Sequence, residues 1–113
     1  IIDFDFISKI KWKNWKGTGI HMFRLWAKIF KDNRMLQDLT ICDDSREKNR
    51  TKKVFDAVDE VCYAFDLSRP IWLDSNIKEF QRVDKTRFRK DNFIDDIEFD
   101  FLEIHVIEED DTY

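Results

Sequence analysis

Glycine and proline are scarce in this chain. Its 113 residues include two glycines and one proline, so most tight turns must be built from Asn, Asp and Ser. The glycine-rich loops that cradle phosphates and the GxSxG turn of serine hydrolases cannot be assembled, and no HExxH pair of zinc ligands occurs. These missing motifs do not exclude an enzyme, but they remove every specific reason to propose one.

Cysteines are also few, and they are isolated. Cys42 and Cys62 are the only two, and they form neither a CxxC pair nor the dense pattern of a disulfide-stabilised secreted domain. We therefore expect two buried thiols in a reducing cytoplasm. Zinc sites usually contain closely spaced ligand pairs, whereas Cys42, Cys62 and His105 are scattered singly. The sequence predicts no metal site and no cofactor, and it indicates no small-molecule ligand.

Long hydrophobic runs are absent as well. No apolar run approaches the ~20 residues of a membrane-spanning helix, so the sequence offers no membrane segment. Hydrophobic residues nevertheless make up 42% of the chain, with eleven Phe and four Trp, and charged residues make up 39%. This composition predicts a single folded domain and not a disordered polyelectrolyte. The net charge of −4 weighs mildly against a dedicated DNA-binding protein.

The beginning of the chain differs in composition from the rest. Residues 1–21 contain both glycines and are rich in Ile, Lys, Phe and Asn. We expect this stretch to be a translated leader upstream of a start at Met22, and residues 22–113 to form one α+β domain. The alternative is a genuine N-terminal strand with its early isoleucine and phenylalanines on one face.

A β-hairpin is predicted next. Apolar and polar residues alternate with a period of two over Phe23–Lys31, which predicts a strand. Asp32 and Asn33 tolerate positive φ angles and suit a tight turn. We expect the return strand over Met35–Cys42.

One amphipathic helix is predicted after the hairpin. Asp44 or Ser45 is suited to cap its first turn, and the helix should run to about Phe65. Its apolar side chains share one stripe at helical spacing: Val54, Phe55, Val58, Val61, Cys62 and Phe65. Lys52 and Lys53 lie off this stripe, so we expect both in water.

The pattern is poor between Ile71 and Ile94. Ser75 is expected to cap a brief turn, and "KTRFRKDNF" is typical of an exposed strand or a loop. A last strand is predicted over Ile97–Ile107, with a change of phase that indicates either a bulge near Phe101–Leu102 or a strand covered on both faces. Together the elements predict an α+β fold, in which one amphipathic helix packs on one face of an antiparallel sheet of three or four strands, in the order strand–strand–helix–strand.

Four segments carry a resemblance to a known family. "YAFDLSRPIWLDSNIKEF", "KTRF", "DNFIDDIEFDFLEI" and "VIEED" resemble a family of short, uncharacterised proteins from anaerobic Gram-positive bacteria. The similarity covers roughly Met22 to Asp110 and begins at that Met, which favours the leader interpretation. The family has no assigned activity, so the resemblance implies a bacterial cytoplasmic protein and carries over no site residue.

Glu103 and His105 are the candidate catalytic pair. Alternate residues of a strand share a face, so the carboxylate could orient the imidazole as in general base catalysis. No nucleophile or metal motif accompanies the pair. We therefore interpret the two residues as polar neighbours on the solvated face of a sheet, and an enzyme using them ranks third among the functions considered.

Charges are segregated along the chain. From Asp91 to Asp111 there are ten acidic residues and no Lys or Arg. The simplest physical account places the acidic last strand beside a basic strand, such as the one containing Arg24 and Lys28. That arrangement would form cross-strand pairs of opposite charge.

Two basic stretches provide the second-ranked function, a nucleic-acid-associated module. "KTRFRK" interleaves Phe88 with four cations, which suits phosphate contacts together with base stacking. The other stretch lies within residues 46–53. The residues concerned are Arg46, Lys48, Arg50, Lys52, Lys53, Lys85, Arg87, Phe88, Arg89 and Lys90.

The surplus of aromatic residues favours protein contacts as the leading function. A sheet covered by one helix leaves its other face to water or to a partner, and aromatic residues are predicted on both faces. Either the segment from Ile71 to Phe93 covers the second face, or another protein or a second copy of this chain does so. The candidate partner-binding residues are Trp26, Phe30 and Trp72.

Overall fold

The computed structural model describes residues 22–109. The expectation of a leader or strand within residues 1–21 lies outside these residues, as does the acidic end of the chain after Glu109. The elements follow one another in this order: β1 (Phe23–Lys31), β2 (Arg34–Asp43), α2 (Arg50–Ala64), α3 (Asp74–Val83), β3 (Lys85–Phe88), the short 3₁₀ helix η2 (Lys90–Asn92) and β4 (Phe101–Glu108).

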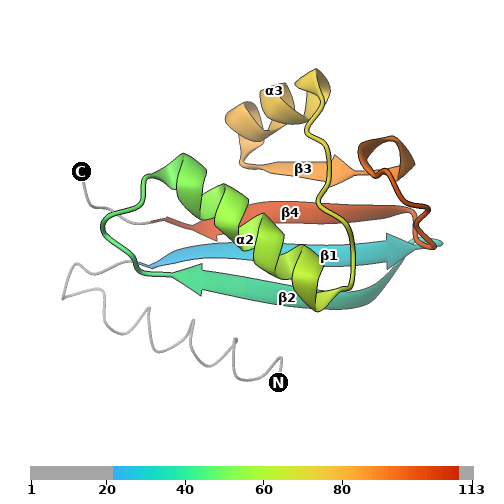
Figure 1. Ribbon diagram of the computed structural model, residues 1–113, viewed down its shortest axis with the longest axis horizontal. Coiled ribbons are helices and arrows are strands. Elements are labelled where there is room, and N and C mark those ends of the chain that lie inside the picture. The colour runs from blue at the N-terminus through green and yellow to red at the C-terminus, as the bar shows by residue number, and fades with distance from the viewer. Residues whose placement is uncertain (1–21, 110–113) are drawn as a thin grey trace.

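The fold is α+β, as the sequence predicts. Within residues 22–109, four antiparallel strands form one sheet in the order β2-β1-β4-β3, so β4 lies in the middle beside β1. Both helices lie on the same face of this sheet, α2 over β1 and β2 and α3 beside β3 (Figure 1). The prediction of a single helix was therefore incomplete, because the expected brief turn at Ser75 is the ten-residue helix α3.

The β1–β2 hairpin is confirmed. Asp32 and Asn33 have φ angles of 54° and 66°, which is the left-handed geometry that a two-residue hairpin turn requires at both positions. The Asp100 carboxylate accepts a hydrogen bond of 2.8 Å from the Asp32 amide, so the turn is also held by the residue that precedes β4.

The core lies between the sheet and the two helices. Odd-numbered residues of β1 and even-numbered residues of β4 face the helices, and the register pairs Ala27 with Ile104 and Leu25 with Val106. From α2 the predicted stripe supplies most of the opposing surface. The buried apolar residues of these three elements are Phe23, Leu25, Ala27, Ile29, Val54, Ala57, Val58, Val61, Cys62, Leu102, Ile104 and Val106.

The predicted start of α2 was wrong by about five residues. The helix begins at Arg50, and the Asn49 side chain accepts a 2.8 Å hydrogen bond from the Lys52 amide. In the loop before the helix, the Ser45 amide donates a 2.8 Å hydrogen bond to the Asp43 carboxylate. Asn49, not Asp44 or Ser45, is therefore the residue that caps this helix.

The last strand is shorter at its start than predicted. It begins at Phe101, while Phe99 lies in the preceding loop and packs edge-on against Phe93, with ring centroids 6.2 Å apart. The apparent change of phase therefore marks the strand boundary. The irregularity in pairing lies at the other end, between Arg24 and Leu25 of β1, so the bulge expected near Phe101–Leu102 is not there.

Candidate functional site

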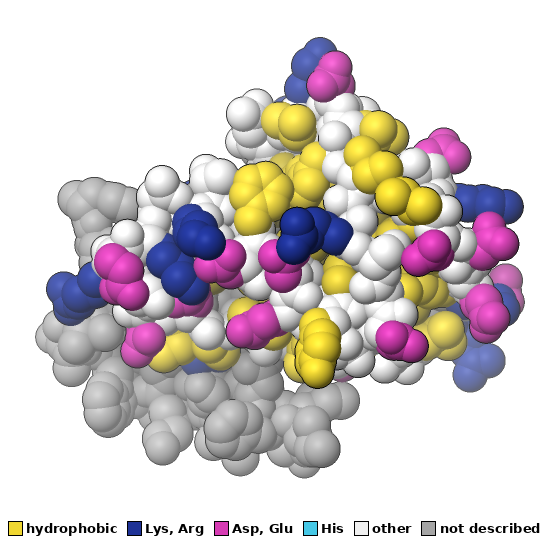
Figure 2. Space-filling view, in the orientation of Figure 1, with side chains coloured by type: hydrophobic (Ala, Val, Ile, Leu, Met, Phe, Trp, Pro, Cys, Tyr) yellow, Lys and Arg dark blue, Asp and Glu magenta, His cyan; other side chains and the backbone are white. Residues whose placement is uncertain are grey.

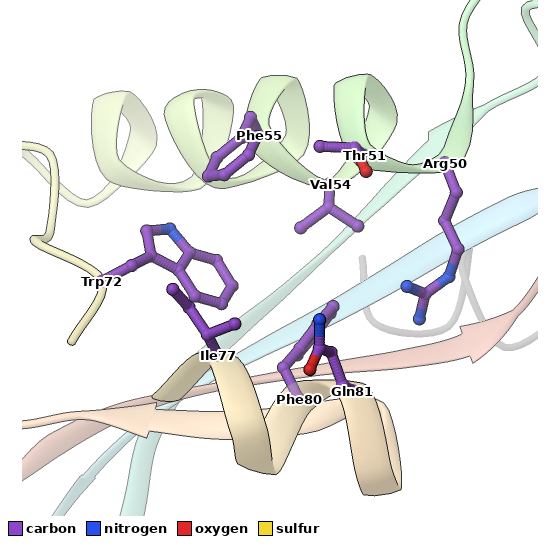
Figure 3. Close-up of a pocket in the computed structure, with 8 residues that line it drawn as sticks. All are labelled: Arg50, Thr51, Val54, Phe55, Trp72, Ile77, Phe80 and Gln81. Atoms are coloured by element: carbon purple, nitrogen blue, oxygen red, sulfur yellow. The ribbon is translucent and has the colours of Figure 1, made fainter. Parts of the chain in front are cut away.

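A groove lies between α2 and α3 on the helix-bearing face. It encloses about 260 Å³, and the surrounding surface carries a gathering of hydrophobic side chains (Figure 2). Phe55 from α2 and Ile77 from α3 point into it from opposite sides (Figure 3) and remain 46% and 41% exposed. The lining residues are Arg50, Thr51, Val54, Phe55, Trp72, Ile77, Phe80 and Gln81.

Trp72 closes one end of this groove. Its ring makes edge-to-face contacts with Phe55, Phe80 and Phe88, with centroids 5.6, 5.4 and 5.1 Å apart. These three rings come from α2, α3 and β3, so a single indole joins the two helices to the sheet. Edge-to-face packing of this kind contributes about 0.5–1.5 kcal/mol per pair beyond the area that it buries.

A buried network of amides fixes the segment that carries Trp72. The Asn76 side chain donates to Thr86 Oγ1 and to the Arg87 carbonyl, each at 2.9 Å. Its oxygen accepts from the Leu73 amide at 3.1 Å and from Asn92 Nδ2 at 2.7 Å. All four hydrogen-bonding positions of this amide are therefore used.

The second amide of the network extends it to the start of the segment. Asn92 Nδ2 also donates to the Ile71 carbonyl at 2.7 Å, and its oxygen accepts from the Arg89 amide at 2.8 Å. The Ile71 amide in turn donates to the Asn92 carbonyl at 2.6 Å. A fully satisfied buried network rigidifies its surroundings, so Trp72 is held on both sides.

Arg50 lies at the opposite end of the groove from Trp72 (Figure 3). Its Nη2 is 2.7 Å from Asp84 Oδ1 and its Nε is 3.0 Å from Glu109 Oε1. The guanidinium also lies 5.3 Å from the centroid of the Phe80 ring. One end of the groove is thus aromatic, and the other carries a positive charge that two carboxylates orient.

On the opposite face of the sheet, which neither α2 nor α3 covers and which we call the open face, three cross-strand rows follow a fourth formed by Cys42, Arg24 and Glu108. One row is Thr40, Trp26, His105 and Lys85; the next is Asp38, Lys28, Glu103 and Arg87; the third is Met35, Phe30 and Phe101. In the middle row Lys28 Nζ is 3.0 Å from Glu103 Oε2, and Arg87 Nε is 2.9 Å from Glu103 Oε1. The predicted pairing of the acidic last strand with the basic first strand is confirmed, and Arg24 with Glu108 at 2.8 Å is a second instance.

Glu103 and His105 share the open face, but the structure does not join them. Among the described residues no hydrogen bond links the two, and the Glu103 carboxylate is taken by Lys28 and Arg87. Burial would raise the pKa of Glu103, but these two hydrogen bonds outweigh it and hold the pKa below its ordinary value of 4.5. Burial, followed by repulsion from Lys85 and Lys28, lowers the pKa of His105 below 6.5. A carboxylate held ionised by two cations is poorly suited to act as a general acid or base with its neighbour.

The ten residues predicted for nucleic-acid binding fall into three groups in the structure: buried residues, residues in ion pairs, and residues that form no ion pair. Phe88 is fully buried beneath Trp72 and Lys53 is buried on α2, so neither can contact a base or a phosphate and the expectation that Lys53 is wet was wrong. Lys48 pairs with Asp43 and Asp56, and Lys52 pairs with Asp56. Arg50 and Arg87 are paired as described above. Among the described residues, four of the ten form no ion pair: Arg46, Lys85, Arg89 and Lys90.

The three predicted partner-binding residues do not share a surface. Trp26 and Phe30 lie on the open face, where Trp26 Nε1 donates to Asp38 at 2.8 Å and Phe30 stacks on Phe101 with centroids 5.1 Å apart. Trp72 lies on the helix-bearing face. The expectation that the segment from Ile71 to Phe93 covers the second face was wrong, because Trp72 and α3 pack on the same side as α2 and β3 is itself a strand of the sheet.

The cysteines are free, and the expectation that both are buried was right for Cys62 and wrong for Cys42. Cys42 is exposed and accepts a hydrogen bond of 2.9 Å from Arg24, whereas Cys62 is buried in the core. Burial, with a contribution from Asp59, raises the pKa of the Cys62 thiol to about 11. Within residues 22–109 no group of three His, Cys, Asp or Glu side chains is arranged to hold a metal ion, and the helices of that region are all too short or too polar to span a bilayer.

Sequence reasoning missed most of the groove. The signal for α3 was present, since Leu73, Ile77 and Phe80 stand at i, i+4 and i+7, the spacing of one helical face. Asn76 and Asn92 gave no such signal, because nothing in their local sequence indicates that both amides are buried together.

Comparison with known proteins adds no constraint on the function of these surfaces. No protein-family model, no curated protein and no solved structure matches the chain. The resemblance to bacterial proteins described above therefore remains a prediction.

Proposed function

We propose that this domain is a protein-interaction module that binds a partner segment in the groove between α2 and α3. The observation that supports the proposal most is the pair Phe55 and Ile77, large apolar side chains that line a groove and stay nearly half exposed. Ile71 and Leu73 beside Trp72 are exposed to a similar extent. Contiguous exposed apolar surface of this kind is typical of interaction sites.

The size of the groove indicates what it would hold. Its volume of about 260 Å³ lies below the range of about 300–1,000 Å³ that is typical of small-molecule sites. It suits one or two apolar side chains of a protein partner. Covering the exposed remainder of Phe55 and Ile77 would contribute roughly 1 kcal/mol for each side chain.

The charge at one end of the groove further defines the partner. Arg50 uses Nε and Nη2 for Glu109 and Asp84, and its Nη1 makes no hydrogen bond with the described residues. We infer a partner segment that is an amphipathic helix, with apolar anchors at helical spacing and an acidic residue beyond them. The anchors would contact Phe55, Trp72 and Ile77, and the acid would lie at Arg50.

The compartment is inferred from the thiols. Both cysteines are free, and Cys62 is buried with a raised pKa, which suits a protein that works in a reducing cytoplasm. The bacterial origin implied by the family resemblance is consistent with this placement.

Selection from a random peptide library on the 113-residue protein tests the proposed site. The selected peptides are expected to contain apolar residues at i, i+3 or i+4, followed by Asp or Glu. Their affinity, measured by fluorescence anisotropy, should fall at least about tenfold for Ile77→Asp, since one lost anchor of ~1.4 kcal/mol or more has this effect. Ile94→Asp is the matched control, because Ile94 is 80% exposed and lies outside the groove.

Two outcomes would redirect the proposal. Peptides that bind both variants equally well would show that the groove is not the site. Light scattering that detects a dimer of the unmodified protein, lost in Ile77→Asp and kept in Ile94→Asp, would identify a second copy of this chain as the occupant.

A further inference from the structure

We propose that the open face beside β3 binds single-stranded nucleic acid, with phosphates at Lys85 and Arg89 and a base stacked on Arg87 above Phe101. This surface lies across the sheet from the α2–α3 groove, so it is independent of the function proposed above. It also narrows the nucleic-acid hypothesis from two basic stretches to one.

Strand geometry brings the cations together. Alternate residues of a strand share a face, so Lys85 and Arg87 both face away from the helices, opposite His105 and Glu103 of β4. Arg89 continues the series, since its guanidinium lies 5.7 Å from the centroid of Phe101 on the same face. These cations border a polar hollow of about 120 Å³ beside β3, together with Glu79, Thr86 and Glu103.

The local charge has the sign that a phosphate requires. The hollow is bordered by three cations, Lys85, Arg87 and Arg89, and by two carboxylates, Glu79 and Glu103, so cations outnumber acids there in a chain of net charge −4. Glu103 is already bound by Lys28 and Arg87. Among the described residues Lys85 and Arg89 form no ion pair, so both are available to phosphates.

The flat groups beside these cations favour a nucleic acid over an acidic peptide. The Arg87 guanidinium lies 4.4 Å from the centroid of Phe101, which itself stacks on Phe30. Arg87 remains 46% exposed, so its outer side is open, and bases stack on guanidinium planes as they do on aromatic rings. A peptide could not instead extend the sheet through the carbonyl edge at this position, because the Arg87 carbonyl is taken by Asn76.

An acidic loop sets the direction of the bound strand. The segment between η2 and β4 is rich in Asp and Glu and leads into Phe101, at one end of the open face. Phosphates that extend past Arg89 toward this loop would be repelled. The bound strand is therefore expected to run along β3 from Arg89 toward Lys85, away from that loop.

Fluorescence anisotropy with labelled ten-nucleotide oligo(dT) and oligo(U), on the 113-residue protein at 50 to 200 mM salt, tests the site. Lys85→Glu combined with Arg89→Glu should weaken binding at least about tenfold at 50 mM salt. It should also reduce the slope of log K against log salt by about 1.4, since each single-strand phosphate contact contributes roughly 0.7. Arg46→Glu combined with Lys78→Glu is the control with the same change of charge at exposed positions away from the open face; it should leave the slope unchanged and weaken binding less than about threefold.

A conservative variant separates stacking from charge. Arg87→Lys keeps the charge and the partner Glu103 but removes the planar guanidinium. We expect a three- to tenfold loss of affinity, at the lower end of the contribution of about 1–3 kcal/mol per stacked base, with the salt slope kept. Thermal melting followed by circular dichroism checks that each variant is folded, and Arg89→Glu alone against Arg46→Glu alone replaces the double variants if either fails to fold.

Three results would overturn the proposal. They are the absence of any oligonucleotide binding at 50 mM salt, an equal loss in the two double variants, and competition by a ten-residue polyglutamate peptide as effective as that by the unlabelled oligonucleotide. The last result would identify an acidic peptide as the partner of this face.

Discussion

The two faces of the sheet bury their side chains in different ways. On the helix-bearing face, Leu25, Ala27 and Ile104 are wholly buried because α2 and α3 cover them. On the open face, described side chains bury one another in cross-strand rows, and Glu103 is only 5% exposed with its carboxylate between Lys28 and Arg87. The same strands therefore contribute a hydrophobic core on one side and a layer of charges and rings on the other.

This difference predicts that the helix-bearing face contributes more to the free energy of unfolding than the open face does. Apolar burial contributes about 25 cal/mol for each Å² removed from water, whereas a buried ion pair gains little beyond the cost of taking its two charges out of water. Substitutions on the helix-bearing face should thus cost more stability than substitutions on the open face. The open face is correspondingly the easier place to change binding properties without unfolding the protein.

Ile104→Ala is expected to have the largest effect on stability. Ile104 is fully buried at the centre of β4 beneath the helices, and removing a side chain of this size from a core costs about 2–5 kcal/mol. Urea denaturation measures the change in the free energy of unfolding. Ile94→Ala, at an exposed position, should stay within about 0.5 kcal/mol of the unmodified protein; a similar loss in both variants would contradict the assignment of the core.

Asn76→Ala tests whether a buried polar side chain contributes as much to the free energy of unfolding as a buried apolar side chain on the same face. The substitution leaves the Arg87 carbonyl, the Leu73 amide and one proton of Asn92 Nδ2 without their present partner. Each buried unsatisfied group costs about 1–3 kcal/mol, and because these costs are not additive we expect a total of about 2–4 kcal/mol. Gln81→Ala, on the exposed side of the same helix, is the control and should change the free energy of unfolding by less than about 0.5 kcal/mol. A loss below about 1 kcal/mol for Asn76→Ala would mean that the network is dispensable.

Local pattern was enough to predict one part of this fold. The hairpin was read from period-two alternation and from two residues suited to positive φ, and both properties belong to neighbouring residues. The core stripe of α2 was predicted for the same reason. The cross-strand charge pairs could also be predicted. Acidic residues gather at the end of the chain and basic residues such as Arg24 and Lys28 lie on the first strand, so pairing the two strands brings opposite charges together.

Features that depend on distant parts of the chain could not be predicted. Asn76 and Asn92 become a network only when α3, β3 and η2 meet. Lys53 lies one residue from the apolar stripe, and its burial depends on tertiary packing that helical periodicity does not describe. Predicting the groove would likewise have required knowing on which face of the sheet the segment after α2 packs. This segment packs on the helix-bearing face, and it places Trp72 at the end of the groove.

Glu103→Gln should have a smaller effect that depends on pH. At pH 7 the variant loses the charge that binds Lys28 and Arg87, at a cost of about 1–3 kcal/mol for hydrogen bonds to charged groups. Since the pKa of Glu103 in the folded protein lies below 4.5, its stabilising contribution is fully present above that ordinary value. It is lost as the pH falls through the folded pKa. Urea denaturation from pH 7 to pH 3 should therefore show a constant gap between the two proteins down to about pH 5 and a narrowing gap below it. A gap that does not change with pH would contradict the assigned role of this carboxylate.

Trp26→Phe is expected to have the smallest effect, and it measures how much the contact between two neighbouring rows of the open face contributes. The substitution keeps an aromatic ring beneath Lys28, whose Nζ lies 3.9 Å from the centroid of Trp26, and removes the 2.8 Å hydrogen bond from Nε1 to Asp38. Because Asp38 is partly exposed and water can replace the lost donor, the cost should be below about 1 kcal/mol. A double-mutant cycle with Asp38→Ala isolates this pair. A coupling energy above about 2 kcal/mol would mean that the side-chain rows hold the sheet together as firmly as the core does, and the contrast between the two faces would disappear.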